Sequence, residues 1–294
     1  MAKRMNRRQF FHTGFASAAF MGAGIANMSY TPALNKNIDR VPLGSTGLVV
    51  PRIAMGTGSI GGRRESNQTR LGIRSFVRLA RHAWERGMKF FDMADTYGSH
   101  TYVREVLSEV PREDTVLLSK IWTTDLSWLK TEPVEKTLDR FRLETGSDYF
   151  DIVLLHCLMN GNWKDEKKEF IESLSKAKQQ GIVKKVGVSC HSRDALKVAA
   201  EDPWVDVILA RINPFGTHMD GSPGDIMNIL EAARKNGKGV IGMKIFGNGD
   251  NTTVEERQRS LSYAVSSPNV HCMTLGLESV AQVDDAVNRV VQMV

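Results

Sequence analysis

Three residues that can take part in proton transfer each follow an apolar run, and a fourth, a tyrosine, comes shortly after the first of them. The segment KFFDMADTYGSH carries Asp92 after two phenylalanines and Tyr97 five residues later; Lys120 closes VLLSK and His156 closes DIVLLH. A tyrosine with its ordinary pKa of about 10 needs a nearby cation to exchange its proton at neutral pH, and a lysine paired with a carboxylate is such a cation. A histidine can orient a carbonyl or relay a proton. Together the four residues predict a site for acid–base chemistry.

Each of the four also has a structural explanation when it is taken alone. Asp92 can cap a turn, and Tyr97 can cover the end of a helix. Lys120 can be a solvated residue at a strand end, and His156 can be a hydrogen-bonded core histidine. Their order at the ends of successive apolar runs favours one shared chemical site over four unrelated structural roles.

In this order the residues resemble the catalytic tetrad of the aldo-keto reductase family. Asp92 and Tyr97 fit the family's D-x-A-x-x-Y element, Lys120 its S-K and His156 its L-x-H, and the resemblance runs from about Val41 to the C-terminus. It implies an oxidoreductase that reduces an aldehyde or ketone, or oxidises the alcohol, with a nicotinamide cofactor. By resemblance, Tyr97 is the general acid/base, Lys120 lowers its pKa and Asp92 holds Lys120. His156 would orient the carbonyl.

Helical and extended patterns alternate along most of the chain. Strands are expected near 51–56, 89–94, 116–121, 150–157, 184–190, 205–213, 238–245 and 270–276, and helices near 70–87, 102–109, 133–145, 166–180, 192–201, 224–236, 253–266 and 279–292. Eight strand–helix units in about 250 residues predict an α/β protein with a single (β/α)8 TIM barrel. A short β-hairpin is expected within 41–56, ahead of the first barrel strand. Chemistry in such barrels lies at the carboxyl ends of the strands, where Asp92, Lys120, His156 and Ser189 fall.

The composition fits one large domain at 41–294. The chain has 294 residues, of which 41% are hydrophobic, enough for a full core. Its net charge of +6 includes Lys3, Arg4, Arg7 and Arg8, which precede every acid, so the remainder carries only +2. A nearly neutral body argues against a nucleic acid as partner.

Residues 1–35 resemble a twin-arginine export signal. Arg7 and Arg8 are followed by two phenylalanines, and the run from Phe10 to Met28 is uncharged and rich in glycine and alanine. The expected partner is the Tat export machinery, and the expected location is the periplasm. The run is short and polar residues interrupt it, so no stable membrane span is expected in the mature protein. An uncleaved anchor and an amphipathic N-terminal helix are the alternatives.

The resemblance also implies where a cofactor would bind. The implied residues are Gly56, Thr57, Ser189, Met243, Lys244, Phe246, Gly276, Leu277, Glu278, Gln282 and Asp285. Lys244, Gly247 and Gly249 suit a pyrophosphate, because a cation and bare backbone amides are what an anion needs. Trp122 matches an aromatic residue of the family's substrate pocket.

Three positions depart from the family pattern. Cys190 replaces an asparagine beside Ser189, Leu209 replaces a glutamine, and Met243 replaces a tyrosine that stacks under the nicotinamide in many members. These departures motivate an alternative function, in which the chain is a catalytically idle nucleotide-binding module.

The choice between NAD and NADP depends on the segment Gly276–Ser279. Family members that prefer NADP usually carry an arginine or lysine two or so residues after the glycine, where this chain has Glu278. A carboxylate repels a 2′-phosphate but accepts a hydrogen bond from a ribose hydroxyl. The sequence therefore favours NAD slightly, while Ser279, Gln282 and Arg289 remain possible partners of a phosphate.

The three cysteines, Cys157, Cys190 and Cys272, do not form a pattern typical of a disulfide framework. Cys157 and Cys190 lie beside His156 and His191, so a metal-dependent barrel enzyme is a second alternative. Neighbouring residues on a strand point to opposite faces, which argues against a shared metal, and no metal ligand is expected.

Overall fold

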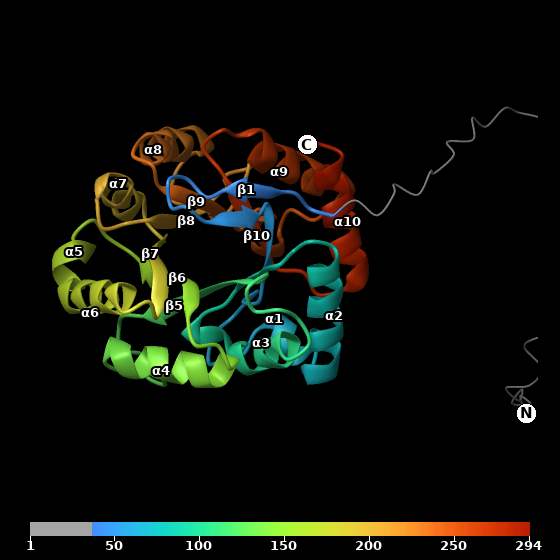
Figure 1. Ribbon diagram of the computed structural model, residues 1–294. Helices are drawn as coiled ribbons and strands as arrows, with labels where there is room; N and C mark the ends of the chain where they lie inside the picture. The colour runs from blue at the N-terminus through green and yellow to red at the C-terminus, as the bar shows by residue number, and fades with distance from the viewer. Residues whose placement is uncertain (1–36) are drawn as a thin grey trace, which may run out of the picture. The chain divides into compact units, whose positions relative to one another are not determined.

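The computed structural model describes residues 37–294, and the export signal expected at 1–35 lies outside them. Eight parallel strands close into a barrel in the order β10-β3-β4-β5-β6-β7-β8-β9, with helices around it (Figure 1). The barrel strands are β3 (Ile53–Gly56), β4 (Phe90–Asp92), β5 (Val116–Trp122), β6 (Phe150–Leu158), β7 (Val183–Cys190), β8 (Val207–Arg211), β9 (Gly239–Met243) and β10 (Cys272–Leu275). The predicted barrel and each of its eight strands are confirmed.

A helix follows each barrel strand, as the alternating sequence pattern predicts. The helices are α1 (Asn67–Arg70), α2 (Ile73–Glu85), α3 (His100–Leu107), α4 (Val134–Thr145), α5 (Trp163–Glu166), α6 (Lys168–Gln179), α7 (Arg193–Glu201), α8 (Pro223–Lys235), α9 (Val254–Ser266) and α10 (Val280–Val291), with 3-10 turns η1 (Asp95–Tyr97) and η2 (Gly247–Gly249). The helix expected at 70–87 is preceded by the separate short α1, because Gly72 adopts a φ of 77° between them.

The predicted hairpin closes one end of the barrel. Strands β1 (Arg40–Pro42) and β2 (Val49–Pro51) pair antiparallel. Leu43 and Val50 are fully buried among side chains of the barrel interior, such as Phe90. A Cβ placed on Gly239, the first residue of β9, would lie 2.6 Å from Leu43 Cγ. The hairpin therefore covers the amino ends of the strands and leaves the carboxyl ends for the site.

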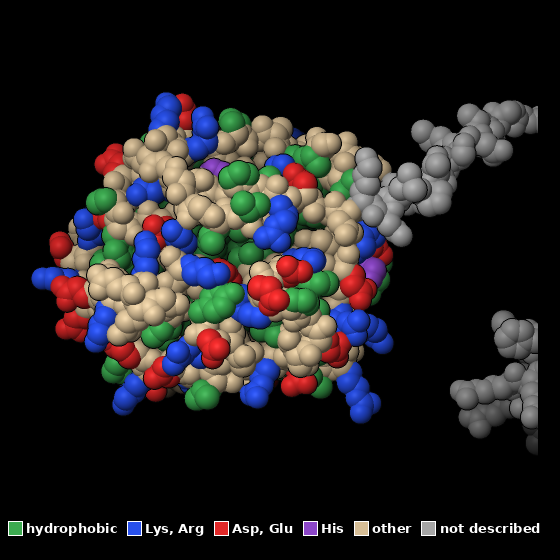
Figure 2. Space-filling model, viewed as in Figure 1, with side chains coloured by type: hydrophobic (Ala, Val, Ile, Leu, Met, Phe, Trp, Pro, Cys, Tyr) green, Lys and Arg blue, Asp and Glu red, His purple; other side chains and the backbone are tan. Residues whose placement is uncertain are grey.

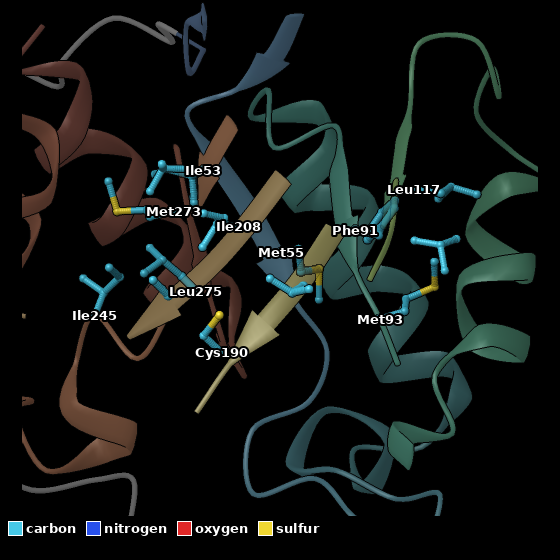
Figure 3. Packing of buried hydrophobic residues seen from close by; sticks show 14 of the residues in the cluster. Ile53, Met55, Phe91, Met93, Leu117, Cys190, Ile208, Ile245, Met273 and Leu275 are labelled. Atoms are coloured by element: carbon cyan, nitrogen blue, oxygen red, sulfur yellow. The ribbon is translucent and has the colours of Figure 1, made fainter. Parts of the chain in front are cut away.

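Strand alternation divides the apolar residues into two layers. One set fills the barrel interior, including Ala54, Phe90 and Leu118. The other set lies between the strands and the surrounding helices, and Figure 3 shows part of it: Ile53, Met55, Phe91, Met93, Leu117, Cys190, Ile208, Ile245, Met273 and Leu275. Asp92 and Lys120 each lie two residues after an interior residue, so the period of two directs both side chains inward.

Acidic and basic side chains are interspersed over the face of the barrel shown in Figure 2. Across residues 37–294, no helix combines the length and the apolar character needed to cross a bilayer.

Candidate active site

The buried ion pair of Asp92 and Lys120 lies at the carboxyl ends of β4 and β5. Lys120 is only 1% exposed. Its Nζ donates to Asp92 Oδ1 and, at 2.9 Å, to the backbone oxygen of Met93. A buried ammonium needs such partners to remain charged. The sequence-based prediction that Asp92 holds Lys120 agrees with this geometry.

Tyr97 is held over this pair by η1. Lys120 Nζ lies 4.8 Å from the centroid of the Tyr97 ring. Gly98, in the left-handed conformation with a φ of 67°, ends the turn directly after it. Gly58 approaches the same ring so closely that an added Cβ would lie 2.2 Å from Cε2. The phenol is therefore fixed by the turn beneath it and by a glycine-containing loop against its face.

The protonation of this trio follows from burial and charge. Burial raises the pKa of the Tyr97 phenol, and the Lys120 charge, which lowers it, does not offset that rise. Lys120 thus lowers the pKa of Tyr97, as the sequence predicts, but the larger effect of burial leaves that pKa raised. Burial lowers the pKa of Lys120, yet Asp92 and Tyr97 outweigh it and the net pKa is raised. At neutral pH the site thus contains a charged lysine and a protonated phenol.

His156 lies beside Tyr97 at the end of β6. The two ring centroids are 5.7 Å apart, and Trp122 also packs edge-on against His156, with ring centroids 5.1 Å apart. Burial, together with the charge of Lys120, holds the pKa of His156 well below its usual value, so the imidazole is neutral. His156 Nδ1 and Trp122 Nε1 are buried without a partner within residues 37–294. The structure thus brings Asp92, Tyr97, Lys120, His156 and Trp122 together.

A cavity of about 560 Å³ extends from Asp92, Tyr97 and Lys120 to the start of α10. Its walls include nine of the eleven residues proposed from the sequence for cofactor binding: Gly56, Met243, Lys244, Phe246, Gly276, Leu277, Glu278, Gln282 and Asp285. The two exceptions are Thr57 and Ser189, which are both fully buried. Thr57 Oγ1 donates to the backbone oxygen of Asp92 at 2.8 Å, so its contacts link β3 to β4 rather than line the cavity.

The middle of the cavity suits an anionic, hydrogen-bonding ligand. Lys244 lies on its wall, and within the described chain its ammonium has no hydrogen bond or ion pair. The neighbouring turn η2 contains Gly247 and Gly249, both with positive φ. A Cβ on Gly276 would meet Ser59 Oγ at 1.9 Å, so any larger residue there would force Ser59 to move. Ser189 Oγ is buried with no hydrogen-bond partner in residues 37–294, although Ser189 does not line the cavity. These features fit the nucleotide expected from the sequence.

The far end of the cavity contains polar residues that the sequence reasoning did not identify. Asn67 Nδ2 donates to Glu278 Oε1 at 2.8 Å, and both residues line the cavity. Arg257 lines it as well and donates to Asp285 Oδ2 at 3.0 Å. Asn67 and Arg257 belong to no motif, and only the closed barrel brings α1 and α9 to the segment Gly276–Ser279.

A polar network behind the site connects the segments that carry Tyr97 and Lys120. Arg140 lies 2.9 Å from Asp95, the first residue of η1, and 3.2 Å from Glu144. Glu144 in turn lies 2.8 Å from His100 Nδ1, and His100 Nε2 lies 2.8 Å from Ser119 Oγ. Ser119 immediately precedes Lys120, so the network fixes the backbone on both sides of the ion pair.

The cysteine–histidine pairs do not converge on one point. Cys190 is fully buried between β7 and the helices (Figure 3). Cys157 is different: β6 has an irregular register here, Cys157 adopts a φ of 63°, and its Sγ lies 3.1 Å from His191 Nδ1. Strict alternation therefore fails at Cys157. No group of three or more histidine, cysteine or acidic residues that could hold a metal occurs in residues 37–294.

Gly58→Ala is expected to lower turnover, because its Cβ would lie 2.2 Å from the Tyr97 ring and either the loop or the phenol must move. Misplacing a catalytic group by about 1 Å can cost on the order of 10²-fold in rate. Gly62→Ala in the same loop is the matched control, since nothing lies within 4 Å of its Cβ. The measurement is kcat and Tm for both variants, and equal kcat values would show that Gly58 does not position Tyr97.

The sequence is similar to known proteins over much of its length. The sequence model described as "Aldo/keto reductase family" matches residues 52–260. Methylglyoxal reductase DkgB of Salmonella typhi is 32% identical over 110 residues, 36% of this chain and 39% of that protein. L-galactose dehydrogenase of Arabidopsis thaliana is 26% identical over 212 residues, 68% of this chain and 62% of that protein. The chain thus matches less than two thirds of the length of either relative.

A solved structure has the same fold. The aldo-keto reductase AKR11C1 from Bacillus halodurans, in its holo form, superposes with a TM-score of 0.69 at 17% sequence identity, covering 86% of this chain and 91% of that one. The family match covers most of the barrel, including Asp92, Tyr97, Lys120 and His156. The chain belongs to the aldo/keto reductase family.

Proposed function

We propose that this protein is a nicotinamide-dependent oxidoreductase that interconverts an aldehyde or ketone and the alcohol. The observation that carries the proposal is the assembly of Tyr97, the Asp92–Lys120 ion pair and neutral His156 at one end of a cavity suited to a nucleotide. A protonated phenol can give its proton to a carbonyl oxygen, and a buried cation beside it stabilises the phenolate that remains.

Each residue of the site has one task in this reaction. Tyr97 donates its proton to the carbonyl oxygen in reduction and takes it back in oxidation. Lys120 stabilises the phenolate that forms, and Asp92 keeps Lys120 charged and in place. Neutral His156 can donate a hydrogen bond to the same oxygen, and Trp122 fixes the His156 ring by packing against it.

The nicotinamide group supplies the hydride when it is bound. Lys244 and the backbone of Gly247 and Gly249 are suited to hold its pyrophosphate. Glu278, with Asn67 bonded to it, lines the outer end of the cavity, while the unpartnered Ser189 hydroxyl is buried behind the cavity wall.

The test combines nucleotide titration, metal analysis and turnover on the same sample. The expected result is binding of NADH or NADPH, no dependence on added or bound metal, and nucleotide oxidation that requires a carbonyl compound. Binding without turnover on a broad panel of aldehydes and ketones would favour the idle module, which Cys190, Leu209 and Met243 motivate. Loss of turnover on chelation would favour a metal-dependent enzyme.

We propose a slight preference for NAD, based on Glu278. Glu278→Arg is expected to shift the ratio of NADPH to NADH affinity upward by about tenfold or more, because a cation would replace a carboxylate near the 2′ position. Arg257 and Arg289, which both bind Asp285, are the cations nearby that could oppose this preference. The measurement is parallel titration of both nucleotides, and tenfold tighter NADPH binding by the unmodified protein would contradict the argument.

We also propose export through the twin-arginine route, based on Arg7 and Arg8 and the uncharged run after them. Replacing both arginines with lysine is expected to keep the protein in the cytoplasm, folded and able to bind nucleotide. Fractionation of cells that express each form is the measurement, and an unchanged periplasmic share would point to another route.

A further inference from the structure

A second polar cluster lies close to His156. We define the mouth cluster as His191, Arg211, Asp220 and Lys244. Arg211 is the last residue of β8, and its Nη2 lies 2.6 Å from His191 Nδ1 while its Nη1 lies 3.0 Å from Asp220 Oδ1. The Arg211 side chain is 18% exposed, so the guanidinium is held in place but is still reachable.

The mouth cluster carries more positive than negative charge. Arg211 and Lys244 are two cations, and Asp220 is one acid. Lys120, the other cation near His156, is already paired with Asp92. Burial followed by the charge of Arg211 lowers the pKa of Lys244, which is the response of an ammonium placed near another cation. Arg211 Nε is buried and has no partner in residues 37–294. Without nucleotide the cluster therefore has one positive charge in excess, and Arg211 is its only cation not already assigned to the pyrophosphate.

His191 adds a hydrogen-bond donor to this cation. Arginine can only donate, so His191 Nδ1 accepts from Arg211, and the ring proton is on Nε2. Burial, followed by the charges of Arg211 and Lys244, lowers the pKa of His191 to about 3, so the ring stays neutral at physiological pH. Within the described residues His191 Nε2 makes no hydrogen bond. A neutral N–H donor thus lies beside a guanidinium.

The mouth cluster is one side chain away from the proposed reaction centre. The His191 and His156 ring centroids are 6.4 Å apart, and His156 is 5.7 Å from Tyr97. Arg211 and His191 do not line the cavity that suits the nucleotide, whereas Lys244 does. The cation and donor are therefore placed for a substrate whose carbonyl lies at Tyr97 and His156.

From this geometry we infer that the substrate is an oxo acid: an aldehyde or ketone whose carboxylate binds Arg211 and His191. The inference rests on the proposed function and names its substrate class. Arg211 would give a charge-assisted hydrogen bond to the carboxylate, and His191 a neutral one. Binding energy from this remote group would hold the carbonyl in line for reduction.

The test uses straight-chain oxo acids and the matching carboxamides, which have nearly the same shape but no charge. The protein is expected to reduce the acids with a higher kcat/KM than the amides. Arg211→Gln is expected to lower kcat/KM for the acid by about 10- to 100-fold, mainly through KM, because a charge-assisted hydrogen bond is lost. For the amide, the same substitution should change kcat/KM by less than about threefold.

Two further variants separate binding from folding. Arg211→Gln leaves the largely buried Asp220 without its partner, so the double variant Arg211→Gln/Asp220→Asn removes both charges and should show the same selective loss. Arg193→Gln is the matched control. Arg193 lies beside Gly221 on the same side of the barrel but pairs with Asp225 and is 46% exposed. Arg193→Gln should leave kcat/KM unchanged for both the acid and the amide.

The outcomes are distinct. An equal kcat/KM for acid and amide in the unmodified protein overturns the carboxylate site and leaves the carbonyl reductase proposal standing. Loss of nucleotide affinity in Arg211→Gln overturns it as well, because the cation would then serve the cofactor. A protein that binds nucleotide but reduces neither compound, nor any other carbonyl, overturns the proposed function and this inference together.

Discussion

Tyr97→Phe is expected to remove most carbonyl reduction and to leave nucleotide affinity nearly unchanged. The phenol supplies the proton, and losing a general acid costs about 10²- to 10⁴-fold in rate. The phenylalanine ring keeps the packing against Gly58 and the edge-on contact with His156, so the site should retain its shape. The raised pKa of Tyr97 strengthens the expectation, because the phenol holds its proton until it is used.

The measurement is kcat with a saturating carbonyl substrate, alongside nucleotide titration. Tyr102→Phe is the matched control, because Tyr102 lies on α3 and packs against Phe76 with ring centroids 5.2 Å apart, away from the site. It should keep full activity. If Tyr97→Phe were equally active, another group would be the proton donor.

Asp92→Asn is expected to lower activity strongly and to shift its pH dependence. The carboxylate helps to raise the pKa of Lys120, so its removal lowers that pKa. Lys120 would then lose its proton at a lower pH, and the alkaline limb of the pH–rate profile would move to lower pH. Removing one partner of a buried ion pair also destabilises a protein by about 3–5 kcal/mol, because the other charge is left unpaired.

Asp151→Asn separates these two effects. Asp151 is also a buried acid with two cationic partners, Arg112 and Lys184, but it lies near the amino end of β6, at the opposite end of the barrel from the site. It should lower Tm without moving the pH profile. The measurements are kcat/KM across pH and thermal unfolding for both variants. An Asp92→Asn protein with an unshifted alkaline limb would show that Asp92 does not act through Lys120.

The barrel and the inner part of the site could be predicted from the sequence because their signals are local. Each strand is an apolar run, and the period of two places Asp92 and Lys120 on the interior face with Phe90 and Leu118. The carboxyl ends of parallel strands meet at one end of a barrel, so residues that close successive runs must approach one another. Order and spacing, together with the resemblance to the family's tetrad, therefore predicted the grouping of Asp92, Tyr97, Lys120 and His156.

The tertiary structure decided what depends on contacts between distant segments. Asn67 and Glu278 are 211 positions apart, and only closure of the barrel between β3 and β10 makes them neighbours. The irregular register at Cys157 turned that side chain toward His191, against the alternation that the sequence predicts. The pKa of Tyr97 rises because burial outweighs the charge of Lys120, and burial depends on all the segments that the fold packs around Tyr97. The mouth cluster arises in the same way, because β7, β8 and the loop that carries Asp220 meet only in the closed barrel.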